Sequence, residues 1–215
     1  MSKKLVCGIG VNDADYPLTE WEITQEYYFN GKRKRKMIWV CPYYKRWKSM
    51  LNRCYSRKCQ EKAPTYKGCT VCEDWLLFSN FKSWMGSQDW EGKELDKDIL
   101  IQGNKRYNKD TCVFIDQVVN KFITDSGGSR GIYLIGCHWL EDNKKFKSQG
   151  SNPFTKKREN LGLFDTEVEA HLVWKKQKHF YAIQLANSGL VTDDRVRQIL
   201  LTRYKNYTTL EYHLK

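Results

Sequence analysis

The sequence predicts an α+β fold, with aromatic helices and a small ββα unit followed by a three-stranded antiparallel sheet packed on a long helix. Apolar residues recur every three or four positions over residues 42–54 and 75–85, which is the period of an amphipathic helix. Short apolar runs bounded by turn residues at 94–101 and 111–115 are typical of strands. Beyond the glycine pair at 127–128 the pattern changes to three short strand-like runs and two helical stretches.

A β-hairpin is expected in the lead-in formed by the first 40 residues. Asn30-Gly31 separates two strand-like runs and favours a type I′ turn, because both central residues of that turn need positive φ. The basic run Lys32 to Lys36 lies in the second strand. It could contact phosphates, or it could be a solvated edge strand in which lysines block aggregation.

Two helices with aromatic faces are expected next. Pro42 suits the first turn of the first helix because proline lacks an N–H donor, and Asp74 can cap the second helix, which Gly86 ends. An aromatic stripe at helical spacing is more often core than a platform for stacking bases, so we predict burial. The apolar faces are Tyr44, Trp47, Leu51 and Cys54 on the first helix and Trp75, Phe78, Phe81 and Met85 on the second.

A ββα unit and a second module follow. The unit comprises the strand ELDKDILI, the turn GNKRYNKD, the strand TCVFI and the helix DQVVNKF, and Asp125 to Gly128 marks its boundary. In the module, GIYLIG, KKFKSQ and LGLF are the expected strands. Thr166 and Glu169 form a capping box for a helix that runs to about Gly189. The predicted segments are 1–40, 41–125, 126–190 and 191–215, the last a terminal helix over DDRVRQILLTRY.

The charge of the chain favours an anionic partner. There are 37 Lys and Arg residues against 25 Asp and Glu residues, a net charge of +12, and nucleic acid is the commonest polyanion in a cell. A surface that is basic merely for solubility is the alternative. The sequence has no run of 18 apolar residues and no lipidation signal, so no membrane association is expected.

The eight cysteines are expected to be free thiols or metal ligands. The start of the chain lacks the apolar region of a secretory signal, which predicts a reducing cytoplasm where disulfides are rare. Cys54 and Cys59, with Cys69 and Cys72, could form a zinc site of four cysteines. Buried thiols are the favoured alternative, because free cysteine is among the most buried residue types.

Several blocks between residues 43 and 124 resemble the HNH (His-Me finger) proteins of tailed phages. They are WKSMLNRCY, TYKGCTVCEDWLLFSNFKSWM, LDKDIL and YNKDTCVFIDQVVNKF, and they occur in the order and rough spacing of that family. The resemblance implies a ββα nuclease scaffold in which a first-strand histidine activates water near a divalent metal. It also implies an orienting asparagine near the second strand and a metal-holding His or Asn on the helix.

This chain departs from the family at the catalytic positions. The first-strand motif is Asp96-Lys97-Asp98, so that Lys97 stands where the family has its histidine. Thr111 stands in the place of the orienting asparagine, whereas Asn120 is retained on the helix. A lysine beside two carboxylates is a poor base at neutral pH, because its charged form is favoured. The chain has four histidines, none in this segment: His138, His171, His179 and His213.

Three interpretations of this degenerate site stay open. In the first, the fold clamps DNA without cutting it, and Lys97 and Arg106 contact phosphates. In the second, Mg²⁺ held by Asp96 and Asp98, or by Asp98 and Asn120, supports nicking without a histidine. In the third, these residues are ordinary surface charges.

The segment from GIY through LGLFDTEVEA resembles the plant Apetala-type DNA-binding domain, which phage HNH proteins often carry. The resemblance covers about 60 residues and implies that one sheet face enters the major groove. Lysines position a protein on phosphates, whereas arginine is the commoner reader of guanine, so loose sequence preference is expected. A solvated basic loop is the alternative. The candidate contacts are Lys144, Lys145, Lys147, Lys156, Lys157 and Arg158.

Together these features predict a phage protein that binds double-stranded DNA in the cytoplasm of an infected bacterium. The HNH-like scaffold lacks the usual catalytic histidine, and Mg²⁺ is the cofactor it could use. Two alternatives are a metal-dependent nicking or homing endonuclease and a phage protein that binds and modulates a host protein.

Overall fold

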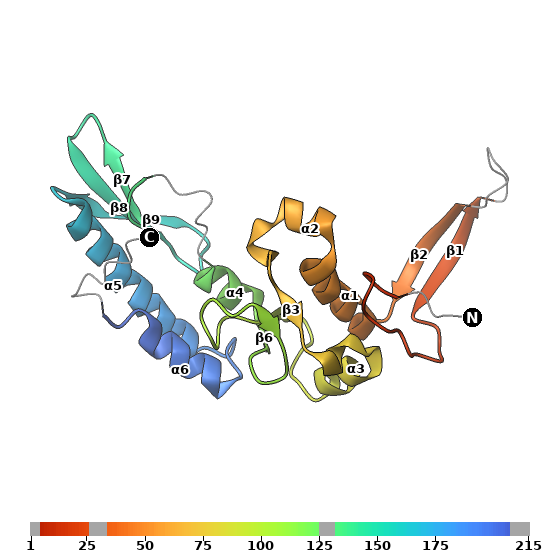
Figure 1. The fold of residues 1–215 in the computed structure, drawn as a ribbon. Coiled ribbons are helices and arrows are strands. Elements are labelled where there is room, and N and C mark those ends of the chain that lie inside the picture. Colours follow the sequence, from red (N-terminus) through yellow and green to blue (C-terminus); the bar gives the residue numbers. More distant parts are fainter. Residues whose placement is uncertain (1–4, 26–33, 125–131, 207–215) are drawn as a thin grey trace. The chain divides into compact units, whose positions relative to one another are not determined.

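The computed structural model describes residues 5–25, 34–124 and 132–206. Residue contacts divide the chain into two compact units (Figure 1). The first unit comprises residues 1–91 and 101–114, and the second comprises residues 92–100 and 115–215. The units therefore do not follow the predicted segment boundaries, since the chain passes between them within the ββα region. The predicted turn at Asn30-Gly31 and the boundary at Asp125 to Gly128 lie outside the described residues.

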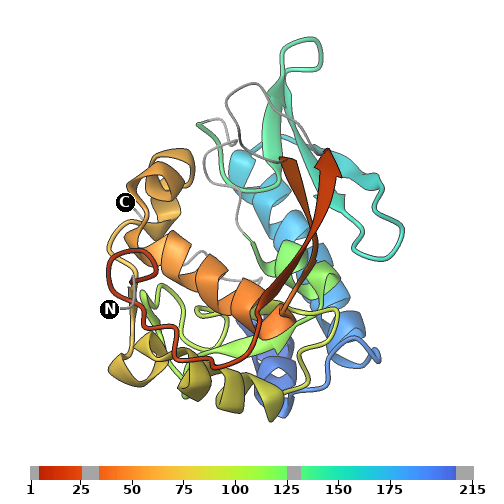
Figure 2. The ribbon, with the colours of Figure 1, turned by 90° about the vertical axis from the view of Figure 1, so that its right-hand side faces the viewer.

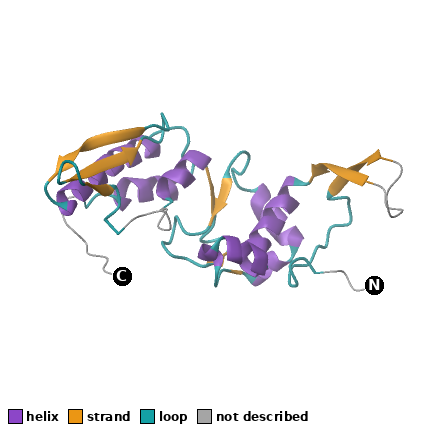
Figure 3. Ribbon diagram, turned by 90° about the horizontal axis from the view of Figure 1, so that it is seen from above, coloured by secondary structure: helices purple, strands orange, loops and turns teal. Residues whose placement is uncertain are grey.

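The predicted hairpin forms at the start of the first unit. Strand β1 (Thr19–Gln25) pairs antiparallel with β2 (Lys34–Val40), and Trp21 lies opposite Met37. The hairpin extends away from the helices of its unit (Figures 1 and 3). Register shifts after Glu20 and Ile23 mark irregular pairing.

The predicted aromatic faces form the core of the first unit. Trp47 and Trp75 are both buried, and Trp47 Nε1 donates a hydrogen bond of 2.7 Å to the carbonyl oxygen of Trp75. This bond satisfies the only polar atom of an otherwise apolar ring. Phe78, Phe81 and Met85 are buried too, as predicted. The helical elements are α1 (Pro42–Tyr55), α2 (Arg57–Lys62), η1 (Pro64–Tyr66), η2 (Glu73–Leu76) and α3 (Phe78–Gly86).

The cap of α3 differs from the prediction. Asp74 lies within the 3-10 turn η2 and does not cap α3. Asp13, from the segment before the hairpin, accepts a hydrogen bond of 3.0 Å from the backbone N–H of Ser79 in the first turn. The orphan donors at a helix start need an acceptor, and here a residue distant in sequence supplies it.

The predicted ββα region is more broken than its apolar pattern suggests. The first strand, β4, is only Glu94–Asp96. It ends because the Asp96 carboxylate accepts hydrogen bonds from the backbone N–H groups of Asp98 (2.8 Å) and Ile99 (2.6 Å), which turns the chain. β3 (Thr70–Val71) pairs with β5 (Arg106–Tyr107), β4 with β6 (Val113–Ile115), and α4 is Gln117–Ile123.

The second unit contains a three-stranded antiparallel sheet and a long helix. The strand order is β7-β8-β9, and helix α5 packs along the sheet (Figure 2). Thr166 and Glu169 form the predicted capping box. The elements are β7 (Cys137–Leu140), β8 (Lys145–Ser151), β9 (Arg158–Phe164), α5 (Glu167–Ala186) and α6 (Asp194–Arg203).

The first strand of this sheet begins later than predicted. The segment that ends in Gly136 is not a strand but lies against α5, where Nδ1 of His171 is 2.8 Å from the carbonyl oxygen of Ile135. Gly136 has φ +84°, and a Cβ at this position would lie 2.1 Å from Cγ of Trp174. The close approach of backbone and indole therefore requires glycine.

No helix in the described ranges combines the length and the apolar character that crossing a membrane requires.

We expect Gly136→Ala to destabilise the second unit by about 2–4 kcal/mol, because it adds a steric clash to an unfavourable positive φ. Gly189→Ala is the matched control, since a Cβ there meets nothing within 4 Å. Urea unfolding followed by circular dichroism measures both. Equal midpoints for the two variants would contradict the close approach of Gly136 to Trp174.

Candidate nucleic-acid interface

Helix α5 occupies one face of the three-stranded sheet. Ser148, at the centre of β8, is fully buried. Cys137, its partner on β7, has its Sγ 3.5 Å from the carbonyl oxygen of Glu167 in α5. Burial raises the pKa of the Cys137 thiol to about 12, so this thiol is neutral packing material at physiological pH. The opposite face, called the outer face below, is the one that can meet a large ligand.

Strand register identifies the residues of the outer face. Directly paired residues of an antiparallel sheet share a face, and successive residues alternate. Because Ser148 faces α5, its neighbours Lys147 and Gln149 face outward. An irregularity between Ser148 and Gln149 resets β9, so that Asn160 pairs with Gln149. The outer face comprises His138, Leu140, Lys145, Lys147, Gln149, Ser151, Arg158, Asn160 and Leu163.

The glutamate in β9 is directed away from the outer face. Glu159 pairs with Gly150 and accepts a hydrogen bond from the hydroxyl of Tyr181 on α5. It also accepts a bond of 2.9 Å from Nδ2 of Asn152. The Tyr181 and Asn152 bonds lower the pKa of the Glu159 carboxyl, since they favour its charged form. Its negative charge is thus held on the helix side, and the charges of β9 separate by face.

The predicted lysines fall into two groups. Lys144 forms an ion pair with Glu141, and Lys145 forms one of 3.0 Å with Asp165. A phosphate would have to compete with these carboxylates. Within the described ranges, no carboxylate lies within ion-pair distance of the other four candidate basic residues. These are Lys147, Lys156, Lys157 and Arg158.

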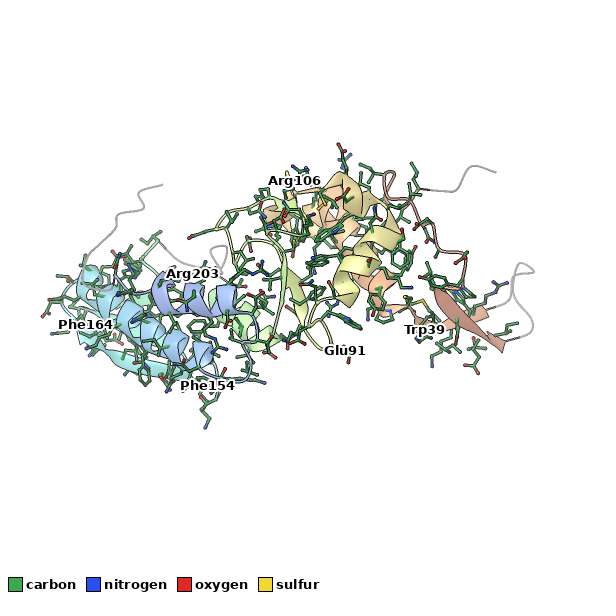
Figure 4. All side chains as sticks on the ribbon, turned by 90° about the horizontal axis from the view of Figure 1, so that it is seen from below. Trp39, Glu91, Arg106, Phe154, Phe164 and Arg203 are labelled. Atoms are coloured by element: carbon green, nitrogen blue, oxygen red, sulfur yellow. The ribbon has the colours of Figure 1, made fainter. Side chains whose placement is uncertain are left out.

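The loop between β8 and β9 has an ordered backbone. Oδ1 of Asn152 accepts bonds from the N–H groups of Phe154 (2.9 Å) and Thr155 (3.1 Å). Lys156 has φ +59°, and its N–H donates a bond of 2.9 Å to the carbonyl oxygen of Asn152. Phe154, labelled in Figure 4, is 46% exposed at this turn. The loop therefore holds the exposed run Lys156 to Arg158 beside the outer face.

The residues predicted from the HNH resemblance lie in a different kind of site. The Asp96 carboxyl is mostly enclosed, and burial raises its pKa, as does the neighbouring Asp98, while its backbone hydrogen bonds oppose the shift. Its hydrogen bonds serve the turn after β4. On α4, Nδ2 of Asn120 donates a hydrogen bond to the Glu94 carboxylate on β4. Asn120 and Glu94 therefore tie the helix to the strand.

Lys97 was predicted to contact phosphates, and its burial contradicts that role. Its side chain is only 7% exposed, and its Nζ lies 3.0 Å from Oδ2 of Asp98. An ammonium group in this position cannot reach a phosphate without leaving its pocket.

Thr111 and Arg106 belong to the first unit. Thr111 shares a hydrogen-bonded turn with Asn104 and Asn108, and its Oγ1 donates to the carbonyl oxygen of Arg106 at 3.2 Å. These bonds give Thr111 a structural role in the turn before β6. Arg106 is exposed (Figure 4), so it stays a candidate phosphate contact of its own unit.

The four candidate zinc cysteines show little sign of a metal centre. Cys54 and Cys69 are buried, whereas Cys59 and Cys72 are partly exposed. Burial raises the pKa of the Cys72 thiol, which disfavours the thiolate that zinc requires. Across residues 5–25, 34–124 and 132–206, no three His, Cys, Asp or Glu side chains are grouped as a metal ion would need.

Three residues of these sites were not singled out from the sequence. Gln149 could have been found, because alternation in β8 places it with Lys145 and Lys147. Asn160 could not, because its side depends on the irregularity opposite Ser148. Glu94 could not be assigned from the sequence, since its partner Asn120 is 26 residues away.

The sequence matches no known protein family, and neither the curated proteins nor the solved structures include a significant match. The HNH and Apetala-type resemblances therefore rest on the short motifs of the sequence.

We expect Lys97→Ala to cost about 1–3 kcal/mol of stability because it removes a buried aliphatic stem. It should leave the slope of log affinity for duplex DNA against log salt unchanged, since a buried ammonium releases no counterion. Lys147→Ala should reduce that slope by up to about 0.9 with little loss of stability. Lys97→Met, which retains the stem, is the packing control. A shallower slope of log affinity against log salt in Lys97→Met would show that Lys97 does contact a phosphate.

Proposed function

We propose that this protein binds double-stranded DNA through the outer face of its three-stranded sheet and the adjoining basic loop. The observation that carries the proposal is the separation of charge between the two sheet faces. Arg158 lies on the outer face beside the basic loop, whereas the adjacent Glu159 is bound to Tyr181 on the helix side. A face of this sign attracts a polyanion, and the net charge of +12 acts in the same direction.

The outer face offers groups for both positioning and base recognition. Lys147 and the loop lysines suit phosphates, which fix the register of a protein on the duplex. Gln149 and Asn160 are cross-strand neighbours with side-chain amides, and amides can bond adenine in the major groove. Arg158 is the only arginine of the outer face and suits guanine or a phosphate. One arginine among several lysines supports a modest sequence preference.

We expect the triple variant Lys156→Ala, Lys157→Ala, Arg158→Ala to bind duplex DNA more weakly and with a shallower salt dependence. The slope of log affinity against log salt concentration should change by about 0.9 for each phosphate contact removed. The matched control changes three exposed lysines of the first unit, Lys58, Lys62 and Lys67, and so removes the same charge. Fluorescence anisotropy with a labelled duplex at several salt concentrations measures both. Equal losses in the two variants would mean that net charge alone drives binding, which would refute the outer face as the reader.

We also propose that the HNH-like segment serves as scaffold without a histidine base. Lys97 supports this proposal because it stands where the histidine is expected and its buried side chain is paired with Asp98. The bonds of Asn120 to Glu94, and of Asp96 to the backbone, give both side chains structural roles.

We expect the wild-type protein to nick supercoiled plasmid slowly or not at all with Mg²⁺ or Mn²⁺. The loss of a positioned general base typically costs about 10² to 10⁴ in rate. Gel electrophoresis of plasmid against time measures nicking, and an Asp98→Asn, Asn120→Ala variant controls for contaminating nuclease. Brisk Mg²⁺-dependent cleavage by the wild type, absent from that variant, would show that another residue acts as the base.

A further inference from the structure

The β1–β2 hairpin exposes large apolar side chains that no described part of the chain covers. Its two strands pair only with each other within the described residues, and the described side chains of 20–24 and 35–39 are all exposed. Trp21, Ile23 and Met37 are each about half exposed. An isolated two-stranded hairpin is marginally stable in water, and an exposed apolar patch of this kind commonly marks a binding surface.

The register sorts the hairpin side chains into two faces. Trp21 pairs with Met37, and Ile23 pairs with Arg35, so these four residues share one face. We call this face the platform. Glu20 and Glu22, the glutamates of the described hairpin, alternate with Trp21 and Ile23 and lie on the other face. The platform therefore combines apolar surface with a guanidinium and carries no carboxylate among the described residues.

The indole nitrogen of Trp21 already has a hydrogen-bond partner within the strand. Its Nε1 donates a hydrogen bond of 3.0 Å to Oγ1 of Thr19, two residues earlier on the same face. The polar atom of the indole is thus satisfied within the strand, and a ligand need not supply a hydrogen-bond acceptor. What remains is an aromatic surface that is 54% exposed, in the same face as Arg35.

We propose that the platform binds unpaired nucleotides by stacking a base on Trp21, with Arg35 contacting the base or a phosphate. Aromatic rings beside positive charge are the usual means of holding single strands, because every base has a π face. A duplex is a poorer ligand for such a ring, since its bases are already stacked on each other.

The charge of β2 favours this ligand over a second copy of the chain. The strand begins with three consecutive basic residues, and Arg35 and Lys36 are exposed within it. Two copies that meet through their hairpins would bring two such strands together, which is unfavourable between like charges. The phosphates of a nucleic acid would instead complement them. This site belongs to the first unit and goes beyond duplex binding by the sheet of the second unit.

The test compares labelled single-stranded DNA, single-stranded RNA and duplex DNA of the same sequence, bound to the full chain. We expect Trp21→Ala to weaken single-strand binding about 5- to 150-fold, the equivalent of one stacked base, and to leave duplex binding unchanged. Trp21→Phe should retain most of the affinity. Trp39→Ala, which removes an exposed tryptophan from the other face of the hairpin, is the matched control and should have little effect.

Arg35→Ala and Arg35→Lys keep the test decisive if Trp21→Ala disrupts the hairpin. Alanine should weaken single-strand binding, and lysine should restore only part of it, because an ammonium group does not stack. Unchanged single-strand affinity in both Trp21→Ala and Arg35→Ala, or equal loss in Trp39→Ala and Trp21→Ala, would overturn the proposal. So would unaltered binding combined with self-association that Trp21→Ala abolishes, since a second copy would then cover the platform. The triple variant at residues 156–158 should lose duplex binding and keep single-strand binding, so that the two sites fail separately.

Discussion

The packing of α5 on the three-stranded sheet is the constraint on which the second unit depends. The helix covers the sheet face that contains Ser148, and the indole of Trp174 lies so close to the backbone that residue 136 must be glycine. Once that face is closed, the pairing of β9 with β8 assigns the paired side chains of β9 to the core or to the outside. The hydrogen bond from Tyr181 then holds Glu159 on the inside, while Arg158 stays outside. The electrostatic character of the outer face is thus a consequence of helix packing.

Structural features that depend on residues close together in sequence could be predicted. The stripe that includes Trp75 and Phe81 is buried, and Thr166 and Glu169 cap α5, because helical period and capping act within a few residues. Features set by distant residues were not. The acceptor for the start of α3 is Asp13, which comes from a segment more than 60 residues earlier. No local pattern could distinguish it from Asp74, which is adjacent and of the same type.

The candidate interface was predictable in its composition but not in its detail. Positive charge in the loop and β8 was evident, yet Lys144 and Lys145 turn out to be paired with carboxylates. Asn160 faces outward because an irregularity opposite Ser148 resets the alternation of β9, and such irregularities have no reliable sequence signal. The burial of Lys97 could not be predicted either, because a lysine flanked by two aspartates has the pattern of an exposed strand.

The two proposed surfaces suit complementary parts of a nucleic acid. The outer face offers amides, lysines and one arginine, which match base edges and phosphates of a closed duplex. The platform on the hairpin offers Trp21 and Arg35, which match the face of a base that a duplex hides. The two surfaces belong to different compact units, so separate substitutions can test them. If both proposals hold, the chain has separate sites for paired and unpaired nucleotides, whether or not it cuts either.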